Sequence, residues 1–120
     1  GGNPYLMTDF MTGLSGTRVG QNQNINKVRM CINDSDNSYS ESWWNYPYRA
    51  IANANLAITH IPNIEMDATE KSKCLGEAYF LRAYNYFNLV RLFGSVPLVL
   101  VPVDASSPEL YPQQASVEVV

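Results

Sequence analysis

A polar loop that ends in aromatic residues holds the best candidates for a ligand-binding site. Residues 33–44 read NDSDNSYSESWW and combine carboxylates, amides, hydroxyls and aromatic rings. A sugar is bound by an aromatic ring against its apolar face and by hydrogen bonds from acidic and amide side chains to its hydroxyls. We therefore predict sugar contacts from Asp34, Asp36, Asn37, Tyr39 and Trp43. The alternative is a solvated loop that only caps the helix that follows.

The same loop contains an Asp-x-Asp-x-Ser pattern, which hints at a calcium site. An EF-hand loop requires glycine at its sixth position and glutamate at its twelfth. Tyr39 and Asn45 occupy those positions in a loop that starts at Asp34, so we exclude an EF-hand. The single histidine and the two cysteines fit no zinc pattern, and we expect neither a metal nor a cofactor. Cys31 and Cys74 form either one disulfide or two free thiols.

A second stretch, residues 76–100, is dense in rings and charges and raises the question of catalysis. Glu77 and Arg82 stand five positions apart, so they do not lie over each other on a helix. A catalytic acid needs a second group and a cleft, and no such partner is visible. We predict structural ion pairing here, with Arg82 reaching carbonyl groups or a carboxylate on another element. The chain also has no Ser/His/Asp set, phosphate loop or carboxylate pair, so we do not expect an enzyme.

The aromatic residues of this second stretch have helical spacing and surround the helix. That arrangement favours core packing over an exposed stacking platform. The rings are Tyr79, Phe80, Tyr84, Tyr86 and Phe87.

Two long helices must position these residues. Apolar residues recur at helical spacing within residues 43–60, where Pro47 either starts or kinks the helix. Asp67 is a suitable N-cap for a second helix over residues 68–93, and Gly94 suits its C-terminal end. The second helix is apolar on two sides, which predicts burial between neighbours. An antiparallel pair of this kind is an αα-hairpin, the unit of tetratricopeptide-like arrays, so we predict an all-α fold.

The remaining segments carry weaker signals. Residues 1–42 are rich in Gly, Asn, Thr and Asp and are expected to be irregular, with a short helix near residues 5–12. Residues 94–115 are expected to form an extended connection, and residues 116–120 to begin a further helix. The second long helix has more apolar surface than the first can cover, so we expect the chain to be a piece of a larger protein.

Composition narrows the class of partner. The chain has 120 residues, of which 46% are hydrophobic and 16% charged, and its formal net charge is −3. There is no cluster of Lys and Arg, which argues against nucleic acid as a partner. No stretch reaches the roughly 20 apolar residues that a membrane span needs. The low charged fraction suits an extracellular or periplasmic protein.

Two motifs resemble those of the SusD/RagB-type lipoproteins. Residues 44–55, WNYPYRAIANAN, are similar to the family pattern W-x3-Y-x2-I-x2-A-N at Trp44, Tyr48, Ile51, Ala54 and Asn55. Residues 76–100, GEAYFLRAYNYFNLVRLFGSVPLVL, are similar to the family pattern GEA-x-FLRA…YF-x-L-V-x-x-FG-x-VPL. The matching residues are Gly76, Glu77, Ala78, Phe80, Leu81, Arg82, Ala83, Tyr86, Phe87, Leu89, Val90, Phe93, Gly94, Val96, Pro97 and Leu98. The resemblance covers about residues 43–120, and Gln114 stands where the family often has Arg before a further helix.

This resemblance implies a fold, a function and partners. Members of the family are longer outer-membrane, cell-surface lipoproteins of Bacteroidetes, built on tetratricopeptide-like helices with glycan-binding loops. They bind oligosaccharides without catalysing a reaction and deliver them to a TonB-dependent transporter of the SusC type. The lipid anchor that the resemblance implies is expected outside this chain, because neither Cys31 nor Cys74 is in position to carry it. The alternative function is that of a tetratricopeptide-like adaptor that binds a protein partner through its helix groove.

Overall fold

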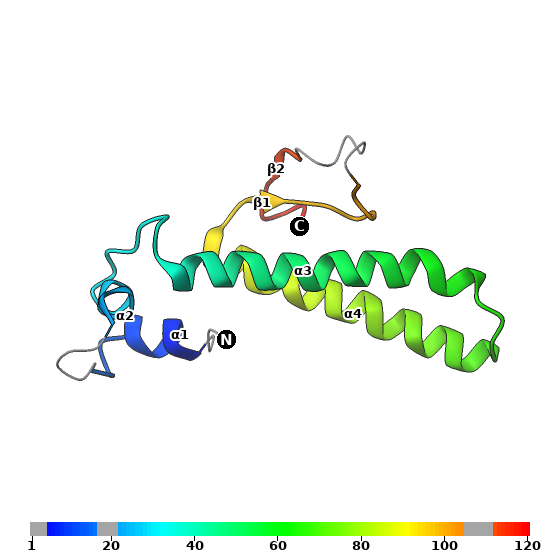
Figure 1. The fold of residues 1–120 in the computed structure, drawn as a ribbon, viewed down its shortest axis with the longest axis horizontal. Helices are drawn as coiled ribbons and strands as arrows, with labels where there is room; N and C mark the ends of the chain where they lie inside the picture. Colours follow the sequence, from blue (N-terminus) through cyan, green and yellow to red (C-terminus); the bar gives the residue numbers. More distant parts are fainter. Residues whose placement is uncertain (1–4, 17–21, 105–111) are drawn as a thin grey trace. The chain divides into compact units, whose positions relative to one another are not determined.

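The computed structural model describes residues 5–16, 22–104 and 112–120. These residues form four α-helices, one short 3-10 helix and two short strands (Figure 1), which confirms the predicted all-α class. They belong to two compact units, Gly1–Tyr46 and Pro47–Val120. Cys31 is exposed and Cys74 half-buried, and both are free thiols in this structure.

The first unit contains more helix than expected. Helices α1 (Tyr5–Met11) and α2 (Gln23–Arg29) lie where residues 1–42 were predicted to be irregular, although the short helix near residues 5–12 was foreseen. The side chain of Asn22 caps α2 by accepting a hydrogen bond of 2.8 Å from the backbone N–H of Asn24. Ile25 and Val28 of α2 are buried. A helix of seven residues contains too few turns to produce a periodic apolar pattern, which is why the sequence did not reveal α2.

Helix α3 (Ser38–His60) begins five residues before the predicted start at residue 43. The start is set by Asn37, whose Oδ1 accepts a hydrogen bond of 3.0 Å from the backbone N–H of Tyr39. Pro47 lies inside α3 and neither begins nor ends it. Because proline has no N–H, the carbonyl of Trp43 receives no hydrogen bond from the residue four positions on. The prediction that the helix begins at residue 43 is therefore wrong, since the cap residue was mistaken for part of the loop.

Helix α4 (Ala68–Phe93) has the predicted bounds. The carboxylate of Asp67 accepts hydrogen bonds from the backbone N–H groups of Thr69 at 2.9 Å and Glu70 at 3.1 Å. The bond from Glu70, followed by that from Thr69, holds the pKa of Asp67 below its ordinary value. Gly94 closes the helix with a φ of +72°, a left-handed conformation that favours glycine. The predicted caps at both ends of this helix are thus confirmed.

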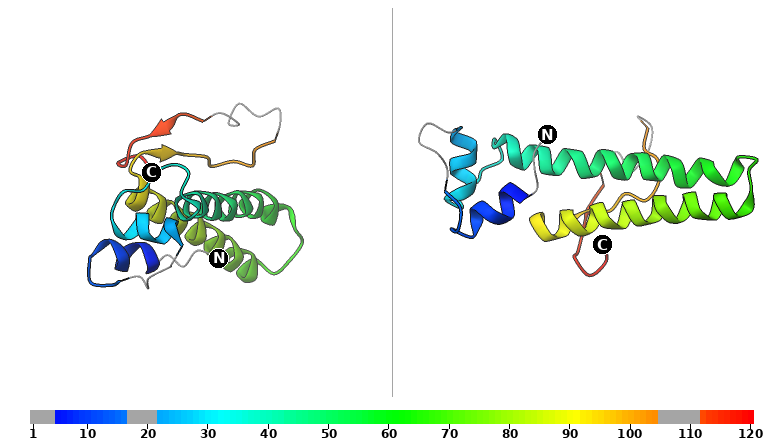
Figure 2. Two further views of the ribbon diagram at one scale, coloured as in Figure 1. Left: turned by 60° about the vertical axis from the view of Figure 1, so that its left-hand side comes forward. Right: turned by 90° about the horizontal axis from the view of Figure 1, so that it is seen from below.

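In the second unit, α4 runs antiparallel beside the part of α3 that follows Pro47, and the 3-10 helix η1 (Ile61–Asn63) leads into the connection (Figures 1 and 2). Strand β1 (Val96–Pro97) pairs antiparallel with β2 (Gln114–Ala115), so the predicted extended connection includes a small two-stranded ladder. Residues 116–120 form a turn, with hydrogen bonds from the N–H groups of Val119 and Val120 to the carbonyl of Ser116. The helix predicted to start there is not observed, because a single turn fixes several dihedral angles for few hydrogen bonds.

The core of this unit lies between the two long helices and β1. Its fully buried side chains include Ile51 of α3, Leu89 of α4 and Val96 of β1. The aromatic residues of α4 do not share this burial. Only Tyr86 of the five predicted core rings is buried, whereas Tyr79, Phe80, Tyr84 and Phe87 are between 50% and 68% exposed. Among the described residues, α3 and the segment after β1 cover one side of α4 and the other side is exposed, so burial of that second side stays a prediction.

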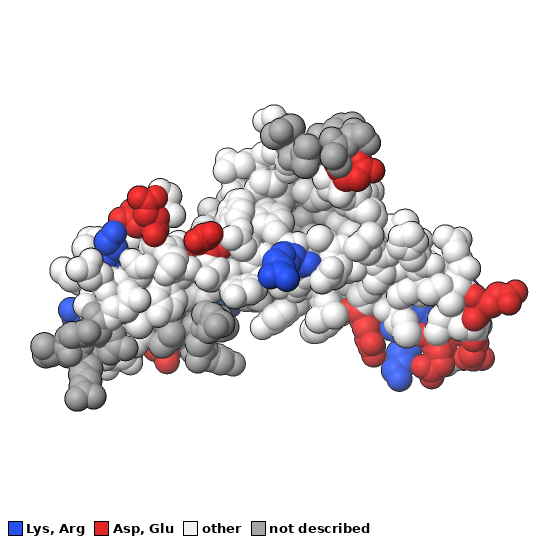
Figure 3. Space-filling model, viewed as in Figure 1, with Lys and Arg blue, Asp and Glu red and all other residues white. Residues whose placement is uncertain are grey.

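Charged residues gather at one end of this unit. Figure 3 shows acidic and basic side chains around the turn that joins α3 to α4, and an otherwise largely uncharged surface along the middle of the two helices. This turn and the first turns of α4 contain Glu65, Asp67, Glu70, Lys71 and Lys73. Hydration of the rest of this surface therefore depends mainly on neutral polar groups.

Candidate functional site

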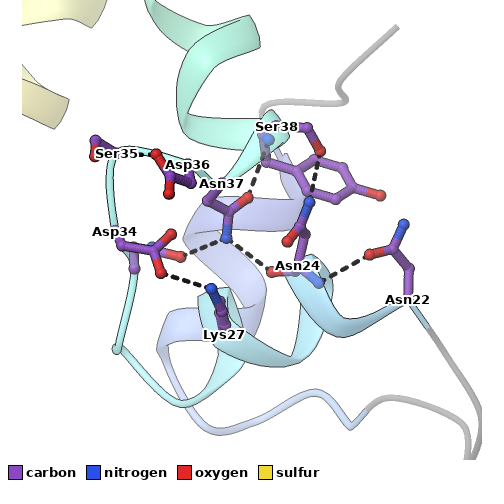
Figure 4. Close-up of polar contacts among 10 residues, drawn as sticks. Asn22, Asn24, Lys27, Asp34, Ser35, Asp36, Asn37 and Ser38 are labelled. Atoms are coloured by element: carbon purple, nitrogen blue, oxygen red, sulfur yellow. Dashed lines mark hydrogen bonds and ion pairs between the residues drawn. The ribbon is translucent and has the colours of Figure 1, made fainter.

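The predicted sugar-contact loop is held to α2 by a polar cluster (Figure 4). Asn37 is at its centre and is fully buried. Its side-chain nitrogen donates hydrogen bonds of 3.0 Å to the backbone carbonyl of Asn24 and of 3.0 Å to Oδ1 of Asn33. The amide of Asn24 in turn donates a hydrogen bond of 2.9 Å to the hydroxyl of Ser38. The amide of Asn37 therefore fixes the loop and the start of α3 and is not available to a ligand in this structure.

The acidic residues of the loop are exposed. Asp34 forms an ion pair of 2.5 Å with Nζ of Lys27, which projects from α2. This hydrogen bond is the main reason why the pKa of Asp34 lies below its ordinary value, and the charge of Lys27 adds to the effect. Asp36 lies beside Ser35, whose hydroxyl donates to the Asp36 carboxylate at 3.4 Å. The loop thus presents two carboxylates and one ammonium group to solvent.

The ion pair between Lys27 and Asp34 predicts a specific pH dependence. Because the folded-state pKa of Asp34 is lowered, the pair contributes its stabilisation fully above the unfolded value near 3.8 and loses it as the pH falls through the lowered value. We expect the NMR titration of the Asp34 carboxyl carbon to have a midpoint below 3.8 and to move upward in Lys27→Ala. The control variant Lys71→Ala should leave that midpoint unchanged. If the Asp34 midpoint is the same in Lys27→Ala as in the wild type, the ion pair is not the cause of the lowered pKa.

The two aromatic candidates lie in the first turns of α3 and are less accessible than predicted. The rings of Tyr39 and Trp43 are 6.1 Å apart and inclined at 51°, which places them in contact. Trp43 is only 5% exposed, whereas Trp44 is half-buried. The buried indole Nε1–H of Trp43 has no hydrogen-bond partner among the described residues. The one-turn spacing from Tyr39 to Trp43 along α3 explains their contact, and the late predicted start of the helix concealed it.

The five candidate residues therefore divide into two groups. Asp34, Asp36 and Tyr39 have exposed or half-exposed side chains, whereas Asn37 and Trp43 are buried. The structure also adds Lys27, which the sequence did not single out because it comes from a helix that was not predicted. No spacing signal in the sequence links Lys27 to Asp34.

A second group of polar side chains clamps the extended segment 96–101 onto the helical hairpin. Asn55 is almost fully buried and donates hydrogen bonds to the carbonyls of Val99 at 3.0 Å and Val101 at 3.2 Å. Arg82 donates from Nη1 to Oδ1 of Asn55 at 2.9 Å and to the carbonyl of Leu100 at 3.0 Å. The prediction that Arg82 reaches carbonyl groups is therefore confirmed. The guanidinium also lies over the ring of Tyr79, 5.3 Å from its centroid.

Two tyrosines complete this clamp. The hydroxyl of Tyr86 accepts a hydrogen bond of 2.7 Å from the N–H of Val99 and donates one of 3.0 Å to its carbonyl. The hydroxyl of Tyr48 donates a hydrogen bond of 2.8 Å to the carbonyl of Pro97. Burial is the main reason why the pKa values of both hydroxyls are raised, so both remain protonated donors at ordinary pH. The clamp satisfies backbone groups of a short segment that has few strand partners of its own.

Replacing Tyr86 with phenylalanine should destabilise the second unit. The change removes only the hydroxyl and leaves the N–H of Val99 without its partner, so we expect a loss of about 1–3 kcal/mol in the free energy of unfolding. Tyr84→Phe is the matched control, because Tyr84 is 54% exposed, and its effect should stay within about 0.5 kcal/mol. Urea unfolding measures both effects. Equal effects of the two variants would argue against a role of the Tyr86 hydroxyl in the clamp.

The described residues were searched for metal-ion sites and for membrane-spanning helices. They contain no group of three or more His, Cys, Asp or Glu side chains placed to hold a metal ion. No helix among them is both long enough and apolar enough to cross a lipid bilayer. A helical hairpin with a clamped extended segment and a polar surface loop belongs to the class of tetratricopeptide-like helical proteins.

Comparison with known proteins gives the family. Residues 3–118 match the SusD-like family that is described as starch-binding and associating with the outer membrane. The chain therefore belongs to the SusD-like family. Two SusD-like proteins of Formosa agariphila are similar to it. P2 is 33% identical over 88 residues, which is 73% of this chain, and P38 is 49% identical over 55 residues, which is 46% of this chain. No solved structure matches significantly.

The chain spans only a small part of these relatives. The matched segment is 17% of the length of P2 and 10% of the length of P38. The motifs that carried the resemblance coincide with the clamp, since Tyr48 and Asn55 belong to the first motif and Arg82 and Tyr86 to the second. The structure therefore gives these motif residues a role in holding the extended segment.

Proposed function

We propose that this chain is part of a surface lipoprotein that binds oligosaccharides at the bacterial outer membrane. The match of residues 3–118 to the SusD-like family carries this proposal. The proposed partner is a TonB-dependent transporter of the SusC type, to which the bound sugar is delivered. Binding and delivery require no bond to be broken, so no catalytic residue is assigned.

Within this chain, the loop between α2 and α3 is the proposed contribution to the sugar site. Asp34 and Asp36 would accept hydrogen bonds from sugar hydroxyls, and Tyr39 would offer part of its ring to the apolar sugar face. Lys27 is 36% exposed at its side chain and is placed to donate to the same ligand. Asn37 and Trp43 would act as positioning residues, because their buried side chains hold the loop and the first turns of α3.

Calorimetric titration of the full-length protein with a panel of oligosaccharides that includes maltooligosaccharides tests this function. We expect saturable binding of at least one sugar, and a loss of about tenfold in affinity in the double variant Asp34→Ala/Asp36→Ala. The control variant Glu65→Ala/Glu70→Ala removes two exposed carboxylates from the other unit and should leave affinity unchanged. Binding that both double variants retain would remove the loop from the site. No binding across the panel, together with no co-purification of a transporter from outer membranes, would refute the proposed function.

A further inference from the structure

The turn that follows α2 contains a residue with an unusual backbone conformation. Cys31 has a φ of +56°, and among the described residues it is the one non-glycine residue with a positive φ. Glycine and asparagine adopt this left-handed conformation most readily, whereas other residues do so at a cost in free energy. Such an outlier persists only where the surrounding structure fixes it, and outliers of this kind cluster at functional sites. Cys31 lies three positions before Asp34, the first carboxylate of the candidate sugar loop.

Two backbone hydrogen bonds fix this conformation. The N–H of Cys31 donates to the carbonyl of Val28 at 3.1 Å. The N–H of Ile32 donates to the carbonyl of Lys27, also at 3.1 Å. These bonds, with a left-handed residue directly after the C-cap Met30, form a Schellman motif. The motif ends α2 and sets the direction in which the chain enters the loop.

Side-chain packing does not hold this turn in place. Met30 is 58% exposed and Ile32 is 57% exposed, and Cys31 is exposed as well. The path of the chain after α2 therefore depends on the backbone conformation at Cys31 and on the two hydrogen bonds. A substitution that permits a left-handed conformation should leave the turn intact, and one that disfavours this conformation strongly should change the path of the loop.

Lys27 connects the turn to the carboxylate that follows it. Its carbonyl accepts the hydrogen bond from Ile32, and its ammonium binds Oδ2 of Asp34 at 2.5 Å (Figure 4). The backbone and the side chain of one residue thus hold both ends of the segment from Ile32 to Asp34. Only two residues separate Cys31 from Asp34, so the chain has little length with which to compensate for a change of direction at Cys31.

We propose that Cys31 is a positioning residue for the candidate sugar loop and that it acts through its left-handed backbone conformation. This inference rests on the proposed function, in which Asp34 accepts hydrogen bonds from sugar hydroxyls. Lys27 binds one oxygen of this carboxylate and thereby orients the group, and the turn at Cys31 brings Asp34 to Lys27. The thiol of Cys31 is not required for sugar binding.

The variant Cys31→Val tests the role of the turn. Valine is β-branched and strongly disfavours a positive φ, so this change should break the turn. Asp34 then loses Lys27, and we expect the NMR midpoint of the Asp34 carboxyl carbon to rise toward 3.8. The midpoint is measured on the full-length protein with isotope-labelled aspartate. We also expect a loss of about three- to tenfold in affinity for the panel oligosaccharide that the wild type binds most tightly.

Two control variants separate the backbone from the thiol and from the substitution itself. Cys31→Asn removes the thiol but introduces a residue that favours the left-handed conformation, so it should retain the Asp34 midpoint and the affinity within about twofold. Cys74→Val makes the same change as Cys31→Val inside α4 of the other unit and should leave the midpoint unchanged. Circular dichroism shows whether Cys31→Val folds, and Cys31→Asn tests the proposal where it does not.

A raised Asp34 midpoint in Cys31→Val, absent from Cys31→Asn and Cys74→Val, supports the proposal. An unchanged midpoint in folded Cys31→Val overturns it. A changed midpoint or affinity in Cys31→Asn also overturns it, because the thiol would then be required. The midpoint is measured without sugar, so this inference and the proposed function fail separately. If the midpoint rises in Cys31→Val but no variant and no wild-type protein binds an oligosaccharide, the role of Cys31 in placing Asp34 stands and the proposed function is refuted.

Discussion

Replacing Arg82 with alanine is expected to lower the free energy of unfolding by about 2–3 kcal/mol. One nitrogen of this guanidinium donates to both Oδ1 of Asn55 and the carbonyl of Leu100. Its loss leaves the buried oxygen of Asn55 without this donor and releases one of the contacts that hold the extended segment on the hairpin. Urea unfolding followed by circular dichroism measures the change, and a sugar titration of the same variant shows whether binding follows stability.

Arg91→Ala is the matched control for this prediction. Arg91 belongs to the same helix and lies over the ring of Phe87, 5.2 Å from the centroid, on the exposed side of α4. An exposed contact of this kind contributes about 0.5–1 kcal/mol, so Arg91→Ala should cost clearly less than Arg82→Ala. An unchanged unfolding midpoint in Arg82→Ala, with loss of sugar affinity, would show that Arg82 belongs to the binding site and that its structural interpretation is wrong.

The long helices were predictable because several local signals agreed. The bounds of α4 follow from three local signals: the carboxylate of Asp67 caps the start, Gly94 closes the end with a positive φ, and Pro97 beyond it prevents continuation. The start of α3 was missed because Asn37 lies in a polar run, residues 33–38, in which each residue is a suitable N-cap. The choice among them depends on contacts with α2, which a local pattern does not contain.

Burial was harder to predict than helix position. The period of apolar residues shows which side of a helix can be buried, but it does not show whether a neighbour is present to cover that side. By residue type, Tyr86 and Phe80 are equally expected to be buried, yet Tyr86 is 3% exposed and Phe80 is 68% exposed. The difference arises because the segment after β1 lies over Tyr86, and this pairing joins residues 13 positions apart through a loop.

Burial was also mispredicted in the candidate sugar site, where two residues expected to contact a ligand are buried. Residue type selected Asn37 and Trp43 as ligand contacts, because amides and indoles do bind sugars. Their surroundings assign them to the interior: Asn37 bonds to Asn24 of α2 and to the nearby Asn33, and Trp43 packs against Tyr39 one helical turn away. Knowledge of α2 would have separated Asn37 from Asp34 and Asp36, and the correct start of α3 would have shown the contact between Trp43 and Tyr39.

The motif residues that form the clamp have a structural role, which is to bond to the backbone of the extended segment. An extended segment with one short ladder leaves most of its N–H and C=O groups without strand partners. Four side chains from α3 and α4 supply partners to several of these groups, namely four carbonyls and the N–H of Val99. The rings and charges of the clamp therefore hold the extended segment on the helices. The candidate sugar contacts lie in residues 33–44, outside the clamp.

Asn55→Leu should destabilise the protein by about 2–4 kcal/mol, although the two side chains have similar volumes. Asn55 is 1% exposed, and it bonds at once to two carbonyls of the extended segment and to Arg82. Leucine offers none of these bonds and leaves the carbonyl of Val101 and the guanidinium of Arg82 with fewer partners. The control Asn45→Leu makes the same change at an exposed position of α3 and should stay within about 0.5 kcal/mol.

The coupling between Asn55 and Arg82 decides whether the clamp acts as one unit. If it does, the double variant Asn55→Leu/Arg82→Ala costs about 1–2 kcal/mol less than the two single variants together, because each single change already breaks their shared hydrogen bond. Urea unfolding of the four proteins in this cycle gives the coupling free energy. Strict additivity would mean that each residue holds its own carbonyl independently, and the extended segment would then be attached by separate contacts instead of a connected network.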